Sequence, residues 1–411
     1  MSAFTGGQYS VYRFLLGLYL CVHFAQLVPY GPEVFSHSGV LPDARLSPFT
    51  GLFHNFLRWF DGPLVVQGAL LAGVFLSAAL AIGRSDRLAA VLIWYLWACL
   101  FGRNPLISNP GLPYIGLLLV VHALLPAGPY GSWRARGRAD PGGDWAMDRN
   151  LWRVVWILMA VGYTYSGVSK LSSPSWTHGE ALEQLLHNPL ARPGWIRDAL
   201  LGLSQDRLHG LTWLALAGEI LFAPLALLRW TRPWIWLAMV GMHLGILLVV
   251  DFADLSLGML LVHLFTFDPR WVPAIRPAQP ETVYYDGECG LCHGAVRFLL
   301  SEDPEGVFLL APLQSEAFEQ ATADIDRTRL PDSILIQSEA GGWLAKGKAV
   351  RHLLAELGGL WRVLGWFLAA IPGPILDGLY DLVAKVRRRV FPKPEGLCPL
   401  VPPHLGKRFL A

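Results

Sequence analysis

The sequence predicts a polytopic α-helical membrane bundle of about eight spans, followed by a small α/β domain with a helical C-terminal extension. The 411 residues are 53% hydrophobic and 16% charged and include 17 tryptophans, whereas soluble domains average about 25% charged residues. Long apolar runs fill the N-terminal part of the chain, and a strand, turn and helix pattern around two cysteines follows them. The net charge of +2 gives no indication of a nucleic-acid partner, and we expect none.

The apolar runs define the predicted spans. The first run has no basic leader and no small-residue cleavage site, so we expect a retained helix rather than a signal peptide. The third and fourth runs fall short of the roughly 20 apolar residues that a bilayer requires, and a re-entrant pair is the alternative for them. In chain order the runs are Val11–Val28, Leu64–Ile82, Leu88–Phe101, Leu112–Leu125, Leu151–Val168, Leu211–Leu228, Trp234–Val250 and Leu255–Phe267.

Arginine-rich loops predict the orientation in a bacterial-type inner or cell membrane. The loops GRSDR, RARGRAD and RWTR fall on one side of the threading, and loops rich in Lys and Arg face the cytoplasm. Both termini and the α/β domain are therefore expected in the cytoplasm. The predicted division is a membrane domain at 1–270, a linker at 271–281, the α/β domain at 282–400 and a tail at 401–411.

Three ionisable residues lie inside the apolar runs: Lys170, Glu219 and His243. Because a lone charge in the bilayer centre costs at least about 3 kcal/mol, such groups normally face the bundle interior and pair with one another. We therefore expect a functional site around Lys170. The alternatives are that Lys170 extends to the outer interface and that His243 and His263 are hydrogen-bonded core histidines.

Two segments of the membrane part resemble a known family. The stretch YSGVSKLSSPSW is similar to a segment of vitamin K-dependent gamma-carboxylases, and FSHSGVLP resembles a loop of the wider HTTM family. The resemblance covers Tyr9 to about Pro269, and it implies that Lys170 acts as the base that engages a vitamin K-like hydroquinone, with Glu219 as the acidic partner. Asn109 matches the asparagine of an asparagine-histidine step whose histidine is Pro110 here, so we expect quinone handling rather than carboxylation.

The stretch VYYDGECGLCHGAVRFLL places Cys289 and Cys292 between a predicted strand and a predicted helix. Val296, Leu299 and Leu300 have helical spacing, so both cysteines are expected in the first helical turn. Backbone N–H groups and the helix dipole stabilise a thiolate there. Cys289 is then the attacking thiolate and Cys292 the resolving thiol.

Two other interpretations of CGLCH are a haem attachment motif and a zinc site. Haem attachment takes place outside the cytoplasm, where this segment is not expected to lie. A zinc site needs two more ligands, for which His293, His352 and Cys398 are the candidates. We predict neither a metal nor a tightly bound cofactor.

From Thr282 to Cys398 the chain resembles the DCC family of thioredoxin-like thiol-disulfide oxidoreductases, named for its D-x-x-C-x-x-C pattern. The pattern is here Asp286, Cys289 and Cys292. The resemblance implies a cis-proline against the dithiol, with Pro331 as the candidate and an ordinary turn proline as the alternative. Asp286 either assists proton transfer from the buried thiol or caps the helix.

These observations predict an integral membrane oxidoreductase that couples thiol-disulfide exchange to quinone handling. The alternative is a non-enzymatic scaffold or transporter-like bundle with a redox-sensing dithiol domain. The predicted partners are membrane lipid, a quinone or other apolar small molecule, and a cytoplasmic thiol or disulfide protein. The tail GLYDLVAKVRRRVFPKP, with apolar residues on one helical face and dense positive charge, predicts docking on the inner leaflet; the alternative is that this helix caps the thioredoxin-like domain, as the family resemblance implies.

Overall fold

The computed structural model describes residues 4–49, 51–327, 330–331, 333–337, 342–390 and 402–411, without the side chains of 387–390. The chain forms two compact units, and each is described by itself. We call Tyr12–Leu125 with Asp148–Phe267 the helical unit. The dithiol unit consists of Met1–Val11, Pro126–Met147 and Asp268–Ala411. The dithiol unit thus includes two segments from the predicted membrane part of the sequence.

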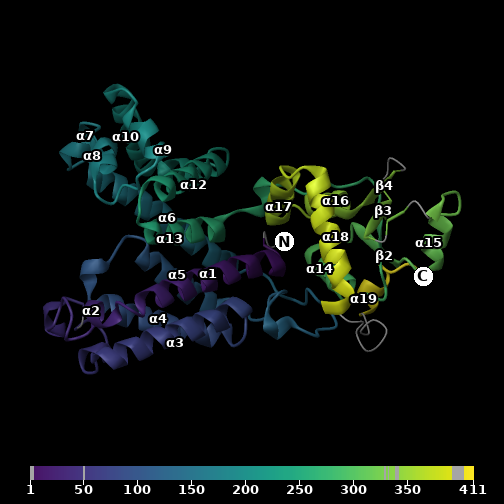
Figure 1. Cartoon of the computed structure of the whole chain (residues 1–411), viewed down its shortest axis with the longest axis horizontal. Helices are drawn as coiled ribbons and strands as arrows, with labels where there is room; N and C mark the ends of the chain where they lie inside the picture. Colours follow the sequence, from purple (N-terminus) through teal and green to yellow (C-terminus); the bar gives the residue numbers. More distant parts are fainter. Residues whose placement is uncertain (1–3, 50, 328–329, 332, 338–341, 391–401) are drawn as a thin grey trace. The chain divides into compact units, whose positions relative to one another are not determined.

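The helical unit is built from α-helices and short connections (Figure 1). Local sequence fixes several of their ends. Pro63 stands at the start of α3, where its missing N–H costs nothing, and Gly83 ends the same helix in the left-handed conformation with φ of 73°. Asp148 caps α6 by accepting hydrogen bonds from the N–H groups of Asn150 and Leu151. The helices are α1 (Gly6–Leu27), which begins in the dithiol unit, α2 (Gly31–Phe35), α3 (Pro63–Ile82), α4 (Asp86–Arg103), α5 (Leu112–Leu124), α6 (Arg149–Lys170), α7 (Pro174–Thr177), α8 (Ala181–His187), α9 (Trp195–Leu201), α10 (Gln205–Ile220), α11 (Phe222–Leu227), α12 (Arg232–Val249) and α13 (Ala253–Thr266).

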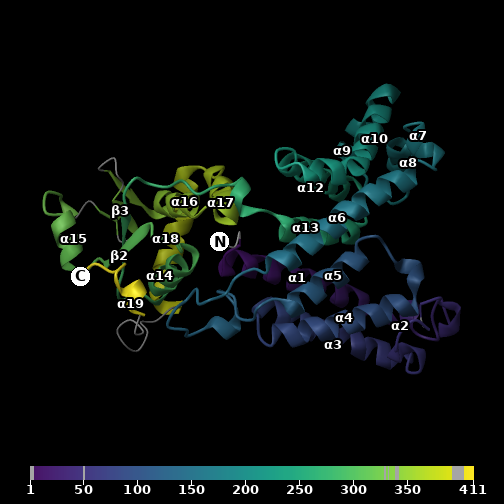
Figure 2. The same cartoon turned by 180° about the vertical axis from the view of Figure 1, so that it is seen from behind.

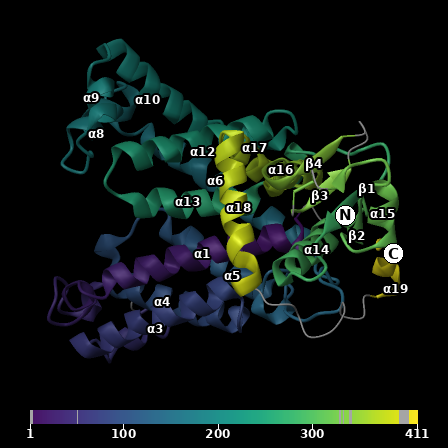
Figure 3. The same cartoon turned by 45° about the vertical axis from the view of Figure 1, so that its right-hand side comes forward.

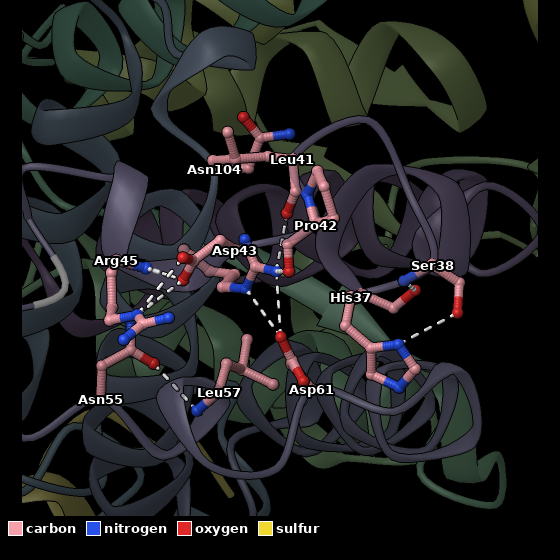
Figure 4. A network of polar contacts seen from close by, with 12 residues as sticks. His37, Ser38, Leu41, Pro42, Asp43, Arg45, Asn55, Leu57, Asp61 and Asn104 are labelled. Atoms are coloured by element: carbon pink, nitrogen blue, oxygen red, sulfur yellow. Dashed lines mark hydrogen bonds and ion pairs between the residues drawn. The ribbon is translucent and has the colours of Figure 1, made fainter.

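Within this unit, α3, α4 and α5 lie side by side, and α6 packs against α10, α11 and α13 (Figure 2). A buried polar network fixes the loop between α2 and α3, which contains FSHSGVLP. The Arg103 guanidinium is fully buried and donates to Asp61 Oδ2 at 2.9 Å and to the Leu41 carbonyl at 2.8 Å. Asn104 Nδ2 donates to the Val34 carbonyl at 2.7 Å, and Figure 4 shows Leu41, Asp61 and Asn104 gathered around this loop.

The prediction of about eight spans is wrong for the part of the chain that is described. Three helices there, α1, α3 and α12, are long and apolar enough to cross a membrane, and a fourth span results if a bent helix pair in the dithiol unit counts as one. Every predicted run does form helix, but α5 and α13 have only 13 and 14 residues. In addition, α4 carries charged residues at both ends, and the predicted sixth span is interrupted at Leu221, between α10 and α11.

The dithiol unit contains a mixed four-stranded sheet with strand order β2-β1-β3-β4 (Figure 3). The central strand β1 (Glu281–Tyr285) pairs in parallel with β2 (Phe308–Pro312) and antiparallel with β3 (Leu335–Gln337), which pairs antiparallel with β4 (Trp343–Ala345). The helices are α14 (Gly290–Glu302), α15 (Glu316–Ala321), α16 (Lys346–Leu357), α17 (Gly359–Ala369), α18 (Gly373–Val390) and α19 (Pro403–Gly406).

Strand alternation divides the core of this sheet into two layers. Val283 and Tyr285 of β1 pack with α14 and α16 on one face. Tyr284 points to the other face and packs against Phe318 of α15. The small α/β domain and its helical extension are therefore confirmed.

The tail helix α18 contains most of the predicted amphipathic segment. Its exposed apolar residues are Leu379, Leu382, Val383 and Val386. The arginine cluster that supplies the predicted positive charge lies at 387–389, whose side chains are outside the described residues. The docking of this helix on lipid stays a prediction.

Candidate functional site

The dithiol lies where β1 ends and α14 begins. Cys289 is the N-cap residue of α14 with an extended backbone, and Cys292 occupies the first turn, so the sequence analysis placed both within one residue of their positions. The Cys289 N–H donates to the Asp286 carbonyl, and the Cys289 carbonyl accepts from the His293 N–H. Both cysteines are in the thiol form and buried, with 1% exposure for Cys289 and 9% for Cys292. A partner disulfide therefore requires a local opening to reach Cys289.

The turn before the dithiol is fixed by its own polar groups. Asp286 is buried and its Oδ1 accepts from the Glu288 N–H at 2.9 Å. Cys289 occupies the N-cap position of α14, and its side chain makes no capping hydrogen bond. The roles considered for Asp286, in proton transfer or in capping, stay predictions. His293 Nε2 lies 2.9 Å from the Gly287 carbonyl, to which it donates a hydrogen bond. His293 therefore positions the turn, a role that the sequence analysis missed because it treated His293 only as a haem or zinc ligand.

Pro331 precedes β3, as predicted, and its carbonyl accepts from the Ser333 N–H at 2.8 Å. The cis geometry expected at Pro331 is wrong, because the described residues contain no cis peptide bond. The Pro331 carbonyl closes a local turn, in agreement with the turn-proline alternative. A contact between Pro331 and the dithiol stays a prediction.

The helical unit contains a cavity of about 900 Å³ that is lined mainly by apolar side chains. Lys170, Glu219 and His243 all line it. Lys170 Nζ lies 2.6 Å from both carboxylate oxygens of Glu219, and Ser166 Oγ donates to the same carboxylate at 3.1 Å. The predicted pairing of Lys170 with Glu219 is present. The position of Lys170 relative to the outer interface stays a prediction.

Two aromatic residues complete this charged wall. The Lys170 ammonium lies 4.3 Å from the ring centroid of Trp176, a cation–π contact that holds the ammonium against the ring. The Tyr163 hydroxyl lies 2.8 Å from the Nε2 atoms of both His243 and His263. Tyr163 and His243 line the cavity, whereas His263 is a buried core residue. The sequence analysis missed Tyr163 and Trp176, although both stand within a few residues of Lys170.

Asn109 belongs to a different polar cluster of the helical unit. Its Nδ2 donates to Asp254 Oδ2 at 3.0 Å. The other oxygen of Asp254 accepts from the Tyr19 hydroxyl at 2.5 Å and lies 2.8 Å from His23 Nδ1. Asn109 lines a second cavity of about 700 Å³ instead of the one beside Lys170. No local sequence pattern links Asp254 to Asn109.

A pair of cysteine thiols at a helix N-terminus after a buried strand is typical of thiol-disulfide exchange proteins. The sequence model of the DCC1-like thiol-disulfide oxidoreductases matches residues 283–393, and the chain belongs to this family through that segment. An uncharacterized protein of Bacillus subtilis strain 168, YuxK, is 34% identical over 132 residues, which cover 32% of this chain and 93% of YuxK. No solved structure matches the chain significantly. The resemblance of the helical unit to the HTTM family stays a prediction.

Proposed function

We propose that this protein is a membrane-embedded thiol-disulfide oxidoreductase whose helical unit binds a quinone or similar apolar ring. The observation that carries the proposal is the pair Cys289 and Cys292 at the start of α14 in a DCC1-like domain. The mixed sheet, with one parallel and two antiparallel strand pairings around β1 and β3, supports a thioredoxin-like fold. Three helices long and apolar enough for a membrane support the embedding.

The reaction is a two-electron exchange. Cys289 attacks a partner disulfide as thiolate, forms a mixed disulfide and releases one partner thiol; Cys292 then attacks Cys289, releases the second partner thiol and leaves a protein disulfide. In the opposite direction a partner dithiol reduces that disulfide. Oxidation of the dithiol to the disulfide releases two electrons and two protons. Reduction of a quinone to a hydroquinone takes up the same number. A quinone can therefore accept the two electrons and two protons that the dithiol releases, and no further co-reactant is needed.

The cavity beside Lys170 supports the quinone assignment. Its lining is mostly apolar, as small-molecule sites usually are, with a few polar groups on one wall. Lys170, Glu219 and Tyr163 on that wall carry hydrogen-bond donors and acceptors suited to ring oxygens. A lysine beside a carboxylate in an apolar cavity also provides groups that can exchange protons with a bound hydroquinone.

The thiol step is tested with the full-length protein in detergent. Cys292→Ser should accumulate a mixed disulfide with a disulfide substrate, because Cys289 can attack that disulfide but the resolving thiol is missing, and Cys289→Ser should not. Cys21→Ser is the control, since Cys21 lies in the helical unit. Mixed-disulfide formation that persists in Cys289→Ser would contradict the assignment of the attacking thiol.

The quinone step is tested by mass spectrometry of the small molecules that copurify with the protein. A quinone should copurify with wild type and be depleted from Lys170→Ala, whereas Lys348→Ala, an exposed lysine of the dithiol unit, should retain it. The wild type should also oxidise a dithiol while reducing added quinone. Dithiol exchange without any quinone reduction would favour a redox-sensing scaffold instead.

A further inference from the structure

A cluster of one histidine and two glutamates lies in the dithiol unit, at the opposite end of β1 from the dithiol. Glu281 is the first residue of β1, and His352 and Glu356 stand one turn apart on α16. His352 Nε2 lies 2.6 Å from Glu281 Oε2 and 3.0 Å from Glu356 Oε1. With a rise of about 3.3 Å per residue, the length of β1 separates this cluster from the dithiol turn by about 13 Å.

The two carboxylates of this cluster are buried. Their side chains are 5% and 2% exposed, while that of His352 is 27% exposed. The backbone N–H of Glu281 donates to the Val307 carbonyl at 3.0 Å, which holds that residue in place. Glu356 Oε2 has no hydrogen-bond partner among the described residues. A buried carboxylate oxygen without a donor is uncommon in folded proteins, because its desolvation costs free energy that a bound cation can recover.

The cluster brings two buried carboxylates onto one imidazole, so its acidic groups outnumber its one basic group. Arg408 of the same unit donates to Asp303 and to the Phe308 carbonyl. A divalent cation with a neutral imidazole and two carboxylates makes the site neutral.

We propose that Glu281, His352 and Glu356 bind a divalent first-row transition-metal ion, with Zn²⁺ as the representative. Zn²⁺ takes imidazole nitrogen and carboxylate oxygen at about 2.0–2.2 Å, and three protein ligands leave one position for water or a further ligand. The imidazole donor favours this class of ion over Mg²⁺ and Ca²⁺, which prefer all-oxygen sites. Tetrahedral bonds of that length separate donor atoms by about 3.3 Å, so the His352–Glu281 separation of 2.6 Å has to open by about 0.7 Å and the His352–Glu356 separation of 3.0 Å by about 0.3 Å.

The proposal is independent of the interpretation of CGLCH as a zinc site. In that interpretation His352 was a candidate ligand for the cysteines, but the structure pairs His352 with Glu281 and Glu356. Cys398, another candidate ligand there, lies outside the described residues.

The dithiol can itself bind Zn²⁺ through sulfur, so the test uses full-length protein that carries Cys289→Ser and Cys292→Ser. The protein is stripped with a chelator, loaded with Zn²⁺ by dialysis in detergent, and its metal content is measured. The expected result is one Zn²⁺ per chain, and a loss of at least tenfold in affinity when His352→Ala or Glu356→Gln is added. Glu305→Gln is the matched control, because Glu305 is an exposed acid of the same unit that pairs with Arg276, and it should retain the ion.

X-ray absorption of the loaded protein gives a readout that does not depend on the variants. The spectrum should show only nitrogen and oxygen neighbours near 2.0 Å, and it keeps the proposal testable if a variant does not fold. Absence of stoichiometric binding, sulfur neighbours in the spectrum, or unchanged binding in both variants would overturn the proposal.

Discussion

Replacing Glu302 should uncouple the dithiol helix from the first residues of the chain. Glu302 ends α14, is buried, and accepts hydrogen bonds through its carboxylate from the Thr5 hydroxyl, the Gly7 N–H at 2.8 Å and the Trp361 Nε1–H at 2.8 Å. Gly7 stands at the start of α1, where backbone N–H groups have no partner within the helix. The Glu302 carboxylate therefore satisfies the N-terminus of α1 within the dithiol unit.

The size of the effect follows from these three donors of other segments; the Ser301 hydroxyl, which also donates at 3.0 Å, belongs to the neighbouring residue. A hydrogen bond to a charged group contributes about 1.5–3 kcal/mol, and a buried donor that is left unpaired costs about 1–3 kcal/mol. The partly buried Thr5 and Trp361 donors can find water, and removal of the carboxylate relieves its own desolvation. We therefore expect Glu302→Ala to lower the free energy of local unfolding by about 3 kcal/mol, the upper end of the cost of one fully buried unpaired donor.

Hydrogen exchange of the full-length protein measures this loss at one atom. A local destabilisation of about 3 kcal/mol lowers the protection of the Gly7 amide by roughly a hundredfold. Glu305→Ala, which removes an exposed acid near the same helix end, is the control and should leave that amide protected. Unchanged protection of Gly7 in Glu302→Ala would refute the reasoning, because it would mean that the carboxylate does not hold this helix end.

Four further outcomes are expected. Burial raises the pKa of Glu302, so its contribution to stability is present below the unfolded value of about 4.3 and is lost as pH rises through the folded pKa; Glu302→Gln should flatten that part of a pH-dependent unfolding curve. Lys170→Ala leaves Glu219 buried without its cation and should destabilise the helical unit by about 3 kcal/mol, with Lys170→Ala/Glu219→Gln recovering part of the loss in thermal unfolding. If the dithiol unit is cytoplasmic, the exposed thiol of Glu305→Cys should escape a membrane-impermeant thiol reagent in intact cells. Leu382→Ser on the exposed face of α18 should weaken binding of the full-length protein to anionic vesicles, and equal binding would leave that face without a lipid role.

Local sequence patterns account for the helices, for the Lys170–Glu219 pair and for the placement of the two cysteines. The apolar runs predict the helices, because an apolar stretch can be recognised from neighbouring residues alone. The cost of a lone charge in an apolar helix correctly predicted that Lys170 pairs with Glu219. The position of Cys289 and Cys292 followed from the strand and helix periods on either side.

Contacts between distant segments were beyond local patterns. Glu302 meets Gly7 across 295 positions, and His352 meets Glu281 across 71. The packing of α16 on the sheet brings His352 to Glu281, and the fold of the dithiol unit brings the end of α14 to the start of α1. The prediction of about eight spans was wrong for another reason. Hydropathy shows how long an apolar run is, whereas the break at Leu221 and the short lengths of α5 and α13 depend on packing.

The proposed quinone reaction places a specific demand on the cavity wall. Reduction of a quinone consumes two protons, and an apolar cavity supplies few of them from water. Lys170 with Glu219 forms one proton-carrying group on the wall, and Tyr163 with His243 forms a second, at hydrogen-bond distances of 2.6 and 2.8 Å. His263 continues the second group into the core through the same Tyr163 hydroxyl. Two such groups on one cavity match the two protons of the reaction, whereas a scaffold that only packs helices has no need to bury either of them.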